Sequence, residues 1–230
     1  MNLLAFDTST EILSAAVLRG GAVVATEQAA GGAHASASLI PVLQSLLARA
    51  GLDVTDLSAI VFGRGPGSFT GLRTACAVAQ GFGFGAGVPV LGIDTLHAVA
   101  ETARAHGGAT RIVAVLDARM QEVYTARYEF DGVQWSRPDD IVLARPQDVE
   151  VPDGWTLAGN AFAAYGDLLP RCERIEAFPD AAAMLRIAPH ALAAGRAQDA
   201  ARAMPVYIRD KVAHTTEERT LMRAAQPPIR

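Results

Sequence analysis

The sequence predicts an α/β protein built from two related units, of which the second is reduced. Half of the 230 residues are apolar, so the chain can bury a sizeable core and general disorder is excluded. In the first 105 residues, short apolar runs and helical periodicities follow one another as three strands, helix, strand, helix, strand, helix. A similar beginning, with two strands in succession, returns at residue 111. Together these observations indicate a duplicated architecture.

The first unit is expected to open with an antiparallel meander of strands at residues 3–6, 14–18 and 22–28. A helix follows, because apolar residues recur at the spacing of one helical face: Leu39, Val42, Leu43, Leu46 and Leu47. Gly51 is placed to end that helix. We expect further strands at 59–62 and 90–93, a loop at 63–67, a helix from Ser68 to about Gly85, and a helix capped by Thr95 that runs to His106.

This order of elements is that of a ribonuclease H-like unit, the building block of the actin-like ATPase and sugar-kinase superfamily. It predicts the fold but says little about which reaction, if any, the protein catalyses. In the second half we expect strands at 111–117, 122–130 and 156–158, a Pro- and Asp-rich stretch at 137–154, and helical segments to about Arg202. The predicted domains are residues 1–105, residues 106–205 as a reduced second copy, and residues 206–230 as a C-terminal segment whose tail frays from His214.

Charge and cysteine content narrow the class of function. The net charge is −4 and Lys211 is the one lysine, so the sequence shows no basic stripe for holding nucleic acid by itself. Cys76 and Cys172 lie far apart, which disfavours a disulfide framework and suits a reducing cytosol. No apolar run is long enough for a membrane span, and the acidic N-terminus does not resemble a signal peptide. We therefore expect a cytoplasmic protein without a membrane partner.

Two segments are candidates for chemistry. Asp7, Thr8, Ser9 and Thr10 directly follow a buried strand, where they would either hold a metal-bound nucleotide or form a polar turn between strands. The glycine-rich stretch 63–73 would place backbone amides at the start of a helix, as anion sites do, or would simply be a loop capped by Ser68. It is neither a Walker A loop nor a nucleophile elbow, because it lacks both patterns.

The histidines and tyrosines give weaker signals. No two histidines stand at metal-ligand spacing on one helix, so no metal site is predicted. Asp94 and His97 are expected in a surface or capping contact. Tyr124 and Tyr128 are expected to pack on a strand face, together with Ala126 and Phe130, and not to form a stacking platform for bases.

Four motifs follow one another along the chain: Asp7-Thr8-Ser9-Thr10, Gly65-Pro66-Gly67-Ser68-Phe69-Thr70-Gly71-Leu72-Arg73, Asp117-Ala118-Arg119 and Pro205-x-Tyr207-Ile208-Arg209. Together they resemble the TsaB family, whose members are non-catalytic partners in the machinery that puts threonylcarbamoyl on adenosine 37 of tRNA. The run from Gly65 to Arg73 is the specific part of the resemblance. The resemblance covers about residues 1–210. It identifies Gly65, Pro66, Gly67, Ser68, Phe69, Thr70 and Arg73 as a family-motif loop.

The resemblance implies a protein without chemistry of its own. The catalytic paralogue TsaD carries a His-x-x-x-His metal pair after the strand that corresponds to residues 90–93, and here Thr95 and Val99 stand in those places. Neither side chain is a metal ligand of that kind, so no metal and no cofactor are expected. Asp7, Thr8 and Ser9 would then be a vestigial nucleotide site. The expected partners are a TsaD-like transferase, a TsaE-like small ATPase and, for the chain alone, a second copy, with tRNA bound only through the complex.

Pairing in the family uses helices of the N-terminal domain, and small residues on a helix allow close approach of a neighbour. The residues expected at the interface are Leu39, Val42, Leu43, Leu46, Gly71, Ala75, Ala79 and Gly83. The alternative is that these faces are used inside the monomer. If they form the interface, Ala79→Arg breaks pairing and leaves the fold intact.

Two enzymatic alternatives remain open at this point. An ATP-dependent phosphotransferase of the actin-like fold would need the Asp7 loop and a second phosphate loop to bind Mg-ATP. A metalloprotease would need histidine ligands that the spacing of the five histidines does not provide.

Overall fold

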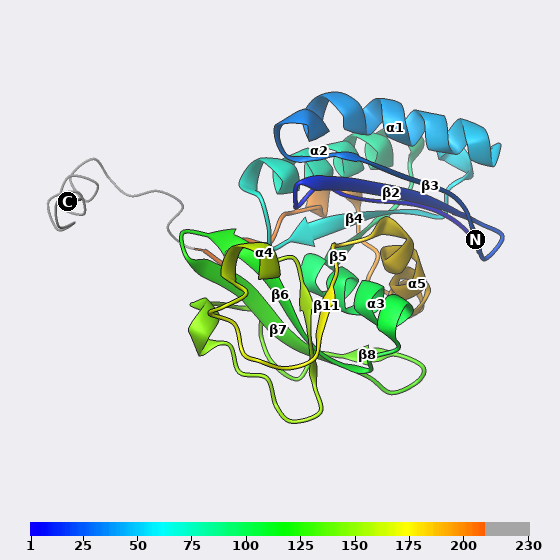
Figure 1. Ribbon diagram of the computed structural model, residues 1–230. Coiled ribbons are helices and arrows are strands. Elements are labelled where there is room, and N and C mark those ends of the chain that lie inside the picture. The colour runs from blue at the N-terminus through cyan, green and yellow to red at the C-terminus, as the bar shows by residue number, and fades with distance from the viewer. Residues whose placement is uncertain (210–230) are drawn as a thin grey trace, which may run out of the picture.

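Two β-sheets with the same strand order form the frame of the computed structural model, which describes residues 1–209 (Figure 1). In the first sheet the strands are ordered β3-β2-β1-β4-β5. β2 runs antiparallel to β1 and to β3, whereas β4 and β5 run parallel to β1. The bounds are β1 (Asn2–Asp7), β2 (Ile12–Arg19), β3 (Ala22–Ala30), β4 (Ala59–Gly65) and β5 (Val90–Asp94). The expected meander and the two further strands are confirmed, and the structure shows that these two run parallel to β1.

Helices α1 (Ala35–Ala50) and α2 (Phe69–Ala86) cover one face of this sheet (Figure 1). Leu39 and Leu43 of α1 pack there against Leu4 and Phe6 of β1. Gly51 ends α1 in the left-handed conformation, with φ of 63°, as the sequence predicts. Short 3-10 turns at Gly32–His34 and Val54–Asp56 flank α1.

The opposite face of the first sheet is covered by α5 (Ala181–Ala193), where Met184 and Leu185 meet Leu3 and Ala5 of β1. Successive residues of β1 therefore enter two different cores, and for this reason the strand reads as a continuous apolar run. The predicted second domain, 106–205, included this helix. The structure instead packs it on the first sheet, because that face would otherwise be exposed.

The second sheet repeats the order as β11-β10-β6-β7-β8, and β9 also pairs with β7. Its strands are β6 (Arg111–Arg119), β7 (Glu122–Phe130), β8 (Trp135–Ser136), β9 (Val142–Ala144), β10 (Thr156–Gly159) and β11 (Arg174–Glu176). Between β8, the counterpart of β3, and β10, the counterpart of β4, the second unit has β9 and a 3-10 turn, Pro146–Asp148, where the first unit has α1. The helix that follows β10 is reduced to α4 (Phe162–Tyr165). The second unit is thus a reduced copy of the first, as expected.

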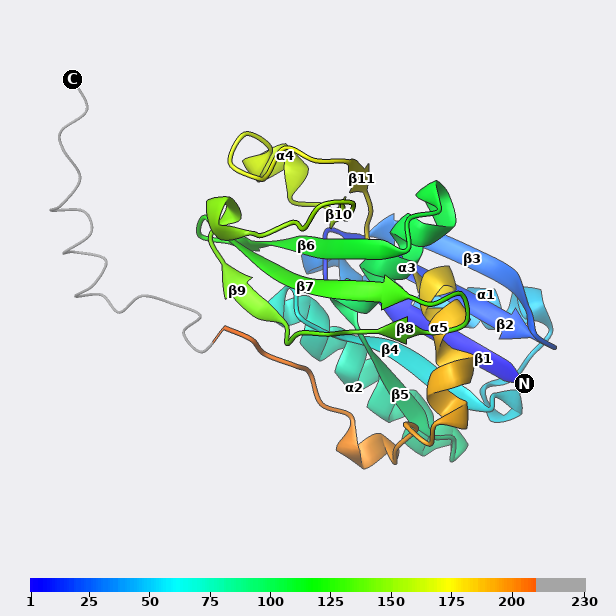
Figure 2. The ribbon, with the colours of Figure 1, turned by 90° about the horizontal axis from the view of Figure 1, so that it is seen from below.

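Helix α3 (Thr95–Gly107) lies between the lobes, with α5 beside it (Figure 2). Tyr124, Ala126 and Tyr128 of β7 pack against it, so the predicted packing role of the two tyrosines is confirmed. Glu101, which is 2% exposed, accepts hydrogen bonds from Arg104 Nε at 2.8 Å, Trp135 Nε1 at 2.9 Å and Arg186 Nε at 2.6 Å. This buried carboxylate ties α3, β8 and α5 together.

After α5 the chain returns along the first lobe toward the gap between the sheets (Figure 2). Gln198 forms a β-bridge with Val90, a 3-10 turn follows at Ala200–Arg202, and Ala203 enters the first core. Only residues 206–209 of the predicted C-terminal segment are described, and the predicted frayed tail lies outside the described residues.

Candidate functional site

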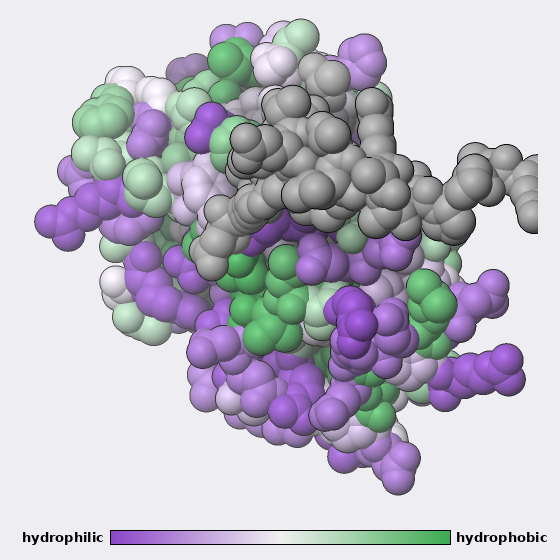
Figure 3. All heavy atoms as spheres, turned by 90° about the vertical axis from the view of Figure 1, so that its left-hand side faces the viewer, coloured by the Kyte–Doolittle hydropathy of each residue, from purple (hydrophilic) through white to green (hydrophobic). Residues whose placement is uncertain are grey.

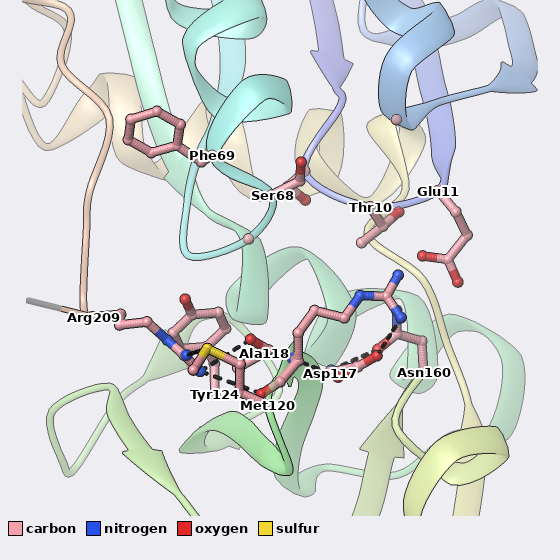
Figure 4. Close-up of a pocket in the computed structure, with 14 residues that line it drawn as sticks. Thr10, Glu11, Ser68, Phe69, Asp117, Ala118, Met120, Tyr124, Asn160 and Arg209 are labelled. Carbon is pink, nitrogen blue, oxygen red and sulfur yellow. Dashed lines mark hydrogen bonds and ion pairs between the residues drawn. The ribbon is translucent and has the colours of Figure 1, made fainter. Parts of the chain in front are cut away.

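A cavity of about 370 Å³ lies between the two lobes, and both lobes and the C-terminal segment line it (Figure 4). The first lobe contributes the loop after β1 and the start of α2. The second lobe contributes the turn between β6 and β7 and the residue after β10. The lining residues are Ser9, Thr10, Glu11, Gly32, Gly67, Ser68, Phe69, Asp117, Ala118, Arg119, Met120, Tyr124, Asn160 and Arg209.

Asp7 is fully buried behind this cavity and does not line it. Its Oδ1 accepts hydrogen bonds from the Ser9 amide at 2.8 Å and the Ser9 hydroxyl at 2.6 Å. Its Oδ2 has no hydrogen-bond partner within the described part of the chain. Burial raises the pKa of Asp7 to about 6, although the two bonds from Ser9 lower it.

Thr8 is also turned inward, and its hydroxyl donates to the Gly71 carbonyl at 2.7 Å. Of the three residues predicted as a vestigial nucleotide site, only Ser9 lines the cavity. The polar turn that the sequence allowed is therefore present, and it encloses the carboxylate that a metal-bound nucleotide would require.

The second lobe repeats this turn. Asp117, near the end of β6, accepts from the Arg119 amide at 2.7 Å, as Asp7 accepts from the amide two residues on. Tyr165 and the Arg119 guanidinium also donate to its carboxylate, at 3.0 and 2.8 Å. Asn160 accepts from the Asp117 amide at 3.0 Å. The duplicated fold thus places an aspartate turn on each side of the cavity.

The family-motif loop fits closely between these parts. A Cβ at Gly65, whose φ is 120°, would lie 2.5 Å from the Val206 carbonyl, and a Cβ at Gly67 would lie 2.6 Å from the Ser9 carbonyl. Ser68 is the N-cap of α2 and its hydroxyl accepts from the Gly71 amide, as predicted. Pro66 is buried, and Thr70 is exposed on the first turn of α2. Glycine at 65 and 67 therefore serves close packing of the loop.

Phe69 and Arg73 of this loop face outward. Phe69 is 40% exposed, and the Arg73 guanidinium stacks on its ring at 3.7 Å. Arg73 Nε also donates to the Tyr207 hydroxyl at 3.1 Å. These contacts join the glycine-rich motif to the late Pro-x-Tyr-Ile-Arg motif.

Arg209 connects the late motif to the second lobe. Its guanidinium donates to the Ala118 and Arg119 carbonyls at 3.0 and 3.3 Å and pairs with Glu122 at 2.7 Å. The Val206 amide donates to the Arg64 carbonyl at 2.6 Å. All four sequence motifs therefore meet at one cleft, although they are spread over some two hundred residues of chain.

The positions expected to have lost the metal ligands lie inside the protein. Thr95 and Val99 are both fully buried, and the Thr95 hydroxyl has no hydrogen-bond partner among residues 1–209. Asp94, and not Thr95, is the N-cap residue of α3. Over the same residues, no three His, Cys, Asp or Glu side chains come together as a metal ion would need.

A surface or capping contact was expected for Asp94 and His97; Asp94 is the N-cap residue of α3, but a surface position is wrong for His97. Its ring is stacked on Tyr128 at 5.2 Å and lies edge-on to Trp135 at 6.0 Å, in the contact between α3 and the second sheet. Burial lowers the pKa of His97 to about 4. Asp94 instead pairs with Arg64 at 2.6 Å and with Arg137 at 3.0 Å.

The residues predicted for a subunit interface are directed into the monomer. Val42 is partly buried, and the others are buried in the first lobe: Leu39, Leu43, Leu46, Gly71, Ala75, Ala79 and Gly83. Because an Arg at position 79 would enter this core, Ala79→Arg cannot test pairing on an intact fold. The outward faces of α1 and α2 carry different residues, among them Ile40, Ala77, Gly81 and Phe84.

Sequence reasoning did not anticipate Glu11, Gly32, Met120 and Tyr124 in the wall of the cavity. They belong to no motif, and it is the pairing of the two lobes that places them there. Periodicity along the chain carries no signal for such a contact.

Two stacked ribonuclease H-like lobes with a cleft between them define a protein of the actin-like class. Residues 24–154 match the family model of TsaD, described as tRNA N6-adenosine threonylcarbamoyltransferase. The chain is 36% identical over 225 residues to the tRNA threonylcarbamoyladenosine biosynthesis protein TsaB of Escherichia coli, with 93% of this chain and 96% of that protein covered. The protein of the same name from Haemophilus influenzae is 33% identical, with 92% and 95% covered.

A solved structure, YeaZ from Pseudomonas aeruginosa, superimposes with a TM-score of 0.84 at 35% identity and covers 90% of this chain and 99% of its own. The chain belongs to the TsaB family.

Proposed function

We propose that the chain is a non-catalytic partner subunit required for N6-threonylcarbamoylation of adenosine 37 in tRNAs that read codons starting with A. In this role it binds and activates a TsaD-like transferase, together with a TsaE-like ATPase. The observation that carries the proposal is the full-length similarity to proteins named for tRNA threonylcarbamoyladenosine biosynthesis. The match of residues 24–154 to the TsaD family is consistent with pairing between paralogues.

The non-catalytic role is supported by the chemistry of three positions. Thr95 and Val99 provide neither an imidazole nor a carboxylate, and both are enclosed in the core. Asp7 is enclosed behind Gly63, away from the inter-lobe cavity. A phosphotransferase would need that carboxylate in the cleft, so the geometry disfavours the phosphotransferase alternative.

Cytoplasmic action with tRNA bound through partners agrees with two properties of the chain. The net charge of −4 provides little attraction for a phosphate backbone. Both cysteines are free thiols, as expected under reducing conditions. In addition, none of the helices in the described residues combines the length and apolar character needed to cross a bilayer.

Pairing, with the transferase or with a second copy, would use the outward faces of α1 and α2. Phe84 is 64% exposed and Ile40 is 42% exposed, and Ala77 and Gly81 stand one helical turn apart. A Cβ at Gly81 would meet nothing within 4 Å, so the helix surface there is open to a neighbour. Small residues flanked by large apolar ones suit close helix packing.

The test is threonylcarbamoyl transfer to tRNA by the catalytic paralogue and the small ATPase, measured with and without this chain. We expect transfer only when the chain is present, and no ATP hydrolysis by the chain alone. Transfer that is indifferent to the chain, combined with hydrolysis of Mg-ATP by the chain alone, would favour the phosphotransferase alternative.

A further inference from the structure

Exposed side chains lie at the inter-lobe cavity and beside it: Phe69 and Met120 line the cavity, and Tyr207 and Arg73 lie against the Phe69 ring. Phe69 is 40% exposed, Tyr207 is 45% exposed and Met120 is 49% exposed. They come from α2, the C-terminal segment and the β6–β7 turn. The left-hand side of Figure 1, seen face-on in Figure 3, carries hydrophobic side chains bordered by hydrophilic ones. We call Phe69, Arg73, Met120 and Tyr207 the mouth patch.

The Arg73 guanidinium is fixed in position by its neighbours in this patch, and its two Nη groups can still bind a ligand. Its guanidinium lies 3.7 Å from the centre of the Phe69 ring, its Nε donates to Tyr207, and the two rings are 5.4 Å apart. Within residues 1–209, its two Nη groups donate to no acceptor and no carboxylate pairs with it. A guanidinium fixed by stacking loses little conformational entropy when it binds an anion.

The turn that carries Met120 has a backbone that is unfavourable for its own residues. Arg119, Met120 and Gln121 all have positive φ, at 62°, 56° and 61°. Two-residue hairpin turns of this kind favour Asn-Gly, because side chains resist the left-handed region. Two sets of hydrogen bonds maintain this conformation. Asp117, two residues earlier on β6, accepts from the Arg119 amide, and Arg209 of the C-terminal segment donates to the Ala118 and Arg119 carbonyls. When residues other than Asn or Gly occupy the left-handed region in a surface turn, their side chains are candidates for a functional role.

The chemistry of the patch favours a protein ligand over RNA. Phe, Tyr, Met and Arg are the residue types enriched in protein interfaces. A nucleic acid would need several cations for its phosphates. The two arginines that line the cavity already pair with acids, Arg119 with Asp117 and Arg209 with Glu122.

We propose that the mouth patch is a docking site for an acidic segment of a partner protein that carries one apolar anchor residue. A carboxylate of the segment binds the Nη groups of Arg73. The anchor side chain packs on Phe69 and Met120 and enters the cavity, whose volume of about 370 Å³ exceeds that of a leucine side chain. This surface is distinct from the outward face of Ile40, Ala77, Gly81 and Phe84, and the proposal does not depend on the proposed function.

The experiment titrates three probes into the full chain and follows the NMR signals of the Met120 methyl and of the Phe69 and Tyr207 rings. The probes are a peptide with one Leu flanked by Asp residues, the same peptide with Lys in place of Asp, and an oligouridine. The variants are Arg73→Gln and Phe69→Ala. Arg145→Gln, an exposed arginine that pairs with Asp148 elsewhere on the second lobe, is the matched control. Thermal unfolding checks that each variant is folded.

We expect the acidic peptide to shift all three signals. The affinity of the acidic peptide for the Arg73→Gln variant should be about tenfold lower, because one charge-assisted pair of hydrogen bonds is lost. Its affinity for the Arg145→Gln variant should remain unchanged. Equal affinity in Arg73→Gln and in the unsubstituted chain would overturn the proposal. So would stronger binding of the Lys peptide, or binding of oligouridine alone at these residues, which would make the patch a nucleic-acid site.

Discussion

The Asp7 carboxylate occupies the space beside Gly63 in which any other residue would place its Cβ. A Cβ built on Gly63 would lie 1.7 Å from Asp7 Oδ2 and 2.7 Å from its carboxyl carbon. Position 63 lies in β4, next to β1, so the close approach is a consequence of sheet pairing. The glycine and the buried acid therefore depend on each other.

Gly63→Ala should lower the free energy of unfolding by several kcal/mol, because the carboxylate cannot move away within a packed core, where overpacking alone costs about 1–3 kcal/mol. Urea unfolding measures the change. Gly81→Ala is the control, since its Cβ meets nothing within 4 Å and Ala stabilises a helix by about 1 kcal/mol relative to Gly. A Gly63→Ala protein as stable as the parent would show that Asp7 is not held against β4.

Asp7 and His97 should give opposite pH dependences of stability. The folded pKa of Asp7, about 6, lies above the ordinary value of 3.8, so its contribution to stability rises as pH falls from about 6 to 4. The folded pKa of His97, about 4, lies below 6.5, so its contribution falls over a similar range. Each effect is on the order of 3 kcal/mol, and the two largely offset each other in the parent protein.

Single variants separate the two effects. His97→Phe keeps a ring against Tyr128 and removes the histidine titration, so acidification from pH 6.5 to 4.5 should then raise stability relative to the parent. Asp7→Asn should show the reverse slope. Urea midpoints at several pH values measure both, and parallel slopes in all three proteins would contradict the assignments.

Arg209→Ala should loosen the β6–β7 turn. The Arg209 side chain is 10% exposed and donates to two carbonyls in addition to its pair with Glu122, so its loss should cost about 1.5–3 kcal/mol. Hydrogen exchange at residues 118–122 should become faster. Arg145→Ala removes an exposed pair with Asp148 and should cost less than about 1 kcal/mol, with no change in the turn. An unchanged rate of hydrogen exchange in Arg209→Ala would mean that the β6–β7 turn keeps its conformation without Arg209.

Gly81→Arg should abolish pairing through α2 without unfolding the chain, because the site is open in the monomer. Size-exclusion chromatography with light scattering should show a monomer that no longer binds the transferase. Val133→Arg, at a 67% exposed position in the second lobe, is the control and should pair normally. Ala79→Arg should instead unfold the protein, since Ala79 is fully buried. A paired Gly81→Arg protein would exclude this face as the interface.

The local features of the fold were predictable because they leave signals in the sequence, namely regular spacing of apolar residues and characteristic residues at helix ends. The apolar spacing of Leu39 to Leu47 predicted α1, and Gly51 and Ser68 marked helix ends where the structure has them. The strands β8, β9 and β11 were missed, because each is only two or three residues long and none has room for an alternating pattern.

The direction of a helix face was less predictable. On α2 the small residues occur on both sides, so composition alone does not show which side faces the sheet. The structure turns Ala75 and Ala79 inward and leaves Ala77 and Gly81 outside. The site was predictable at its motifs, where Ser68 and Asp117 line the cavity, but not at Glu11 or Met120, which are placed there by contact between lobes.

The return of α5 to the first sheet has a consequence for biosynthesis. Residues 1–107 contain every strand of the first sheet, but the face that includes Leu3, Leu18 and Val61 is covered by residues 181–193. When α3 has emerged from the ribosome, residues 181–193 have not yet been synthesised. The nascent chain would therefore expose that apolar face until almost the whole protein has been made. We expect the two lobes to mature together late in translation, and a fragment ending at residue 107 to aggregate when expressed alone.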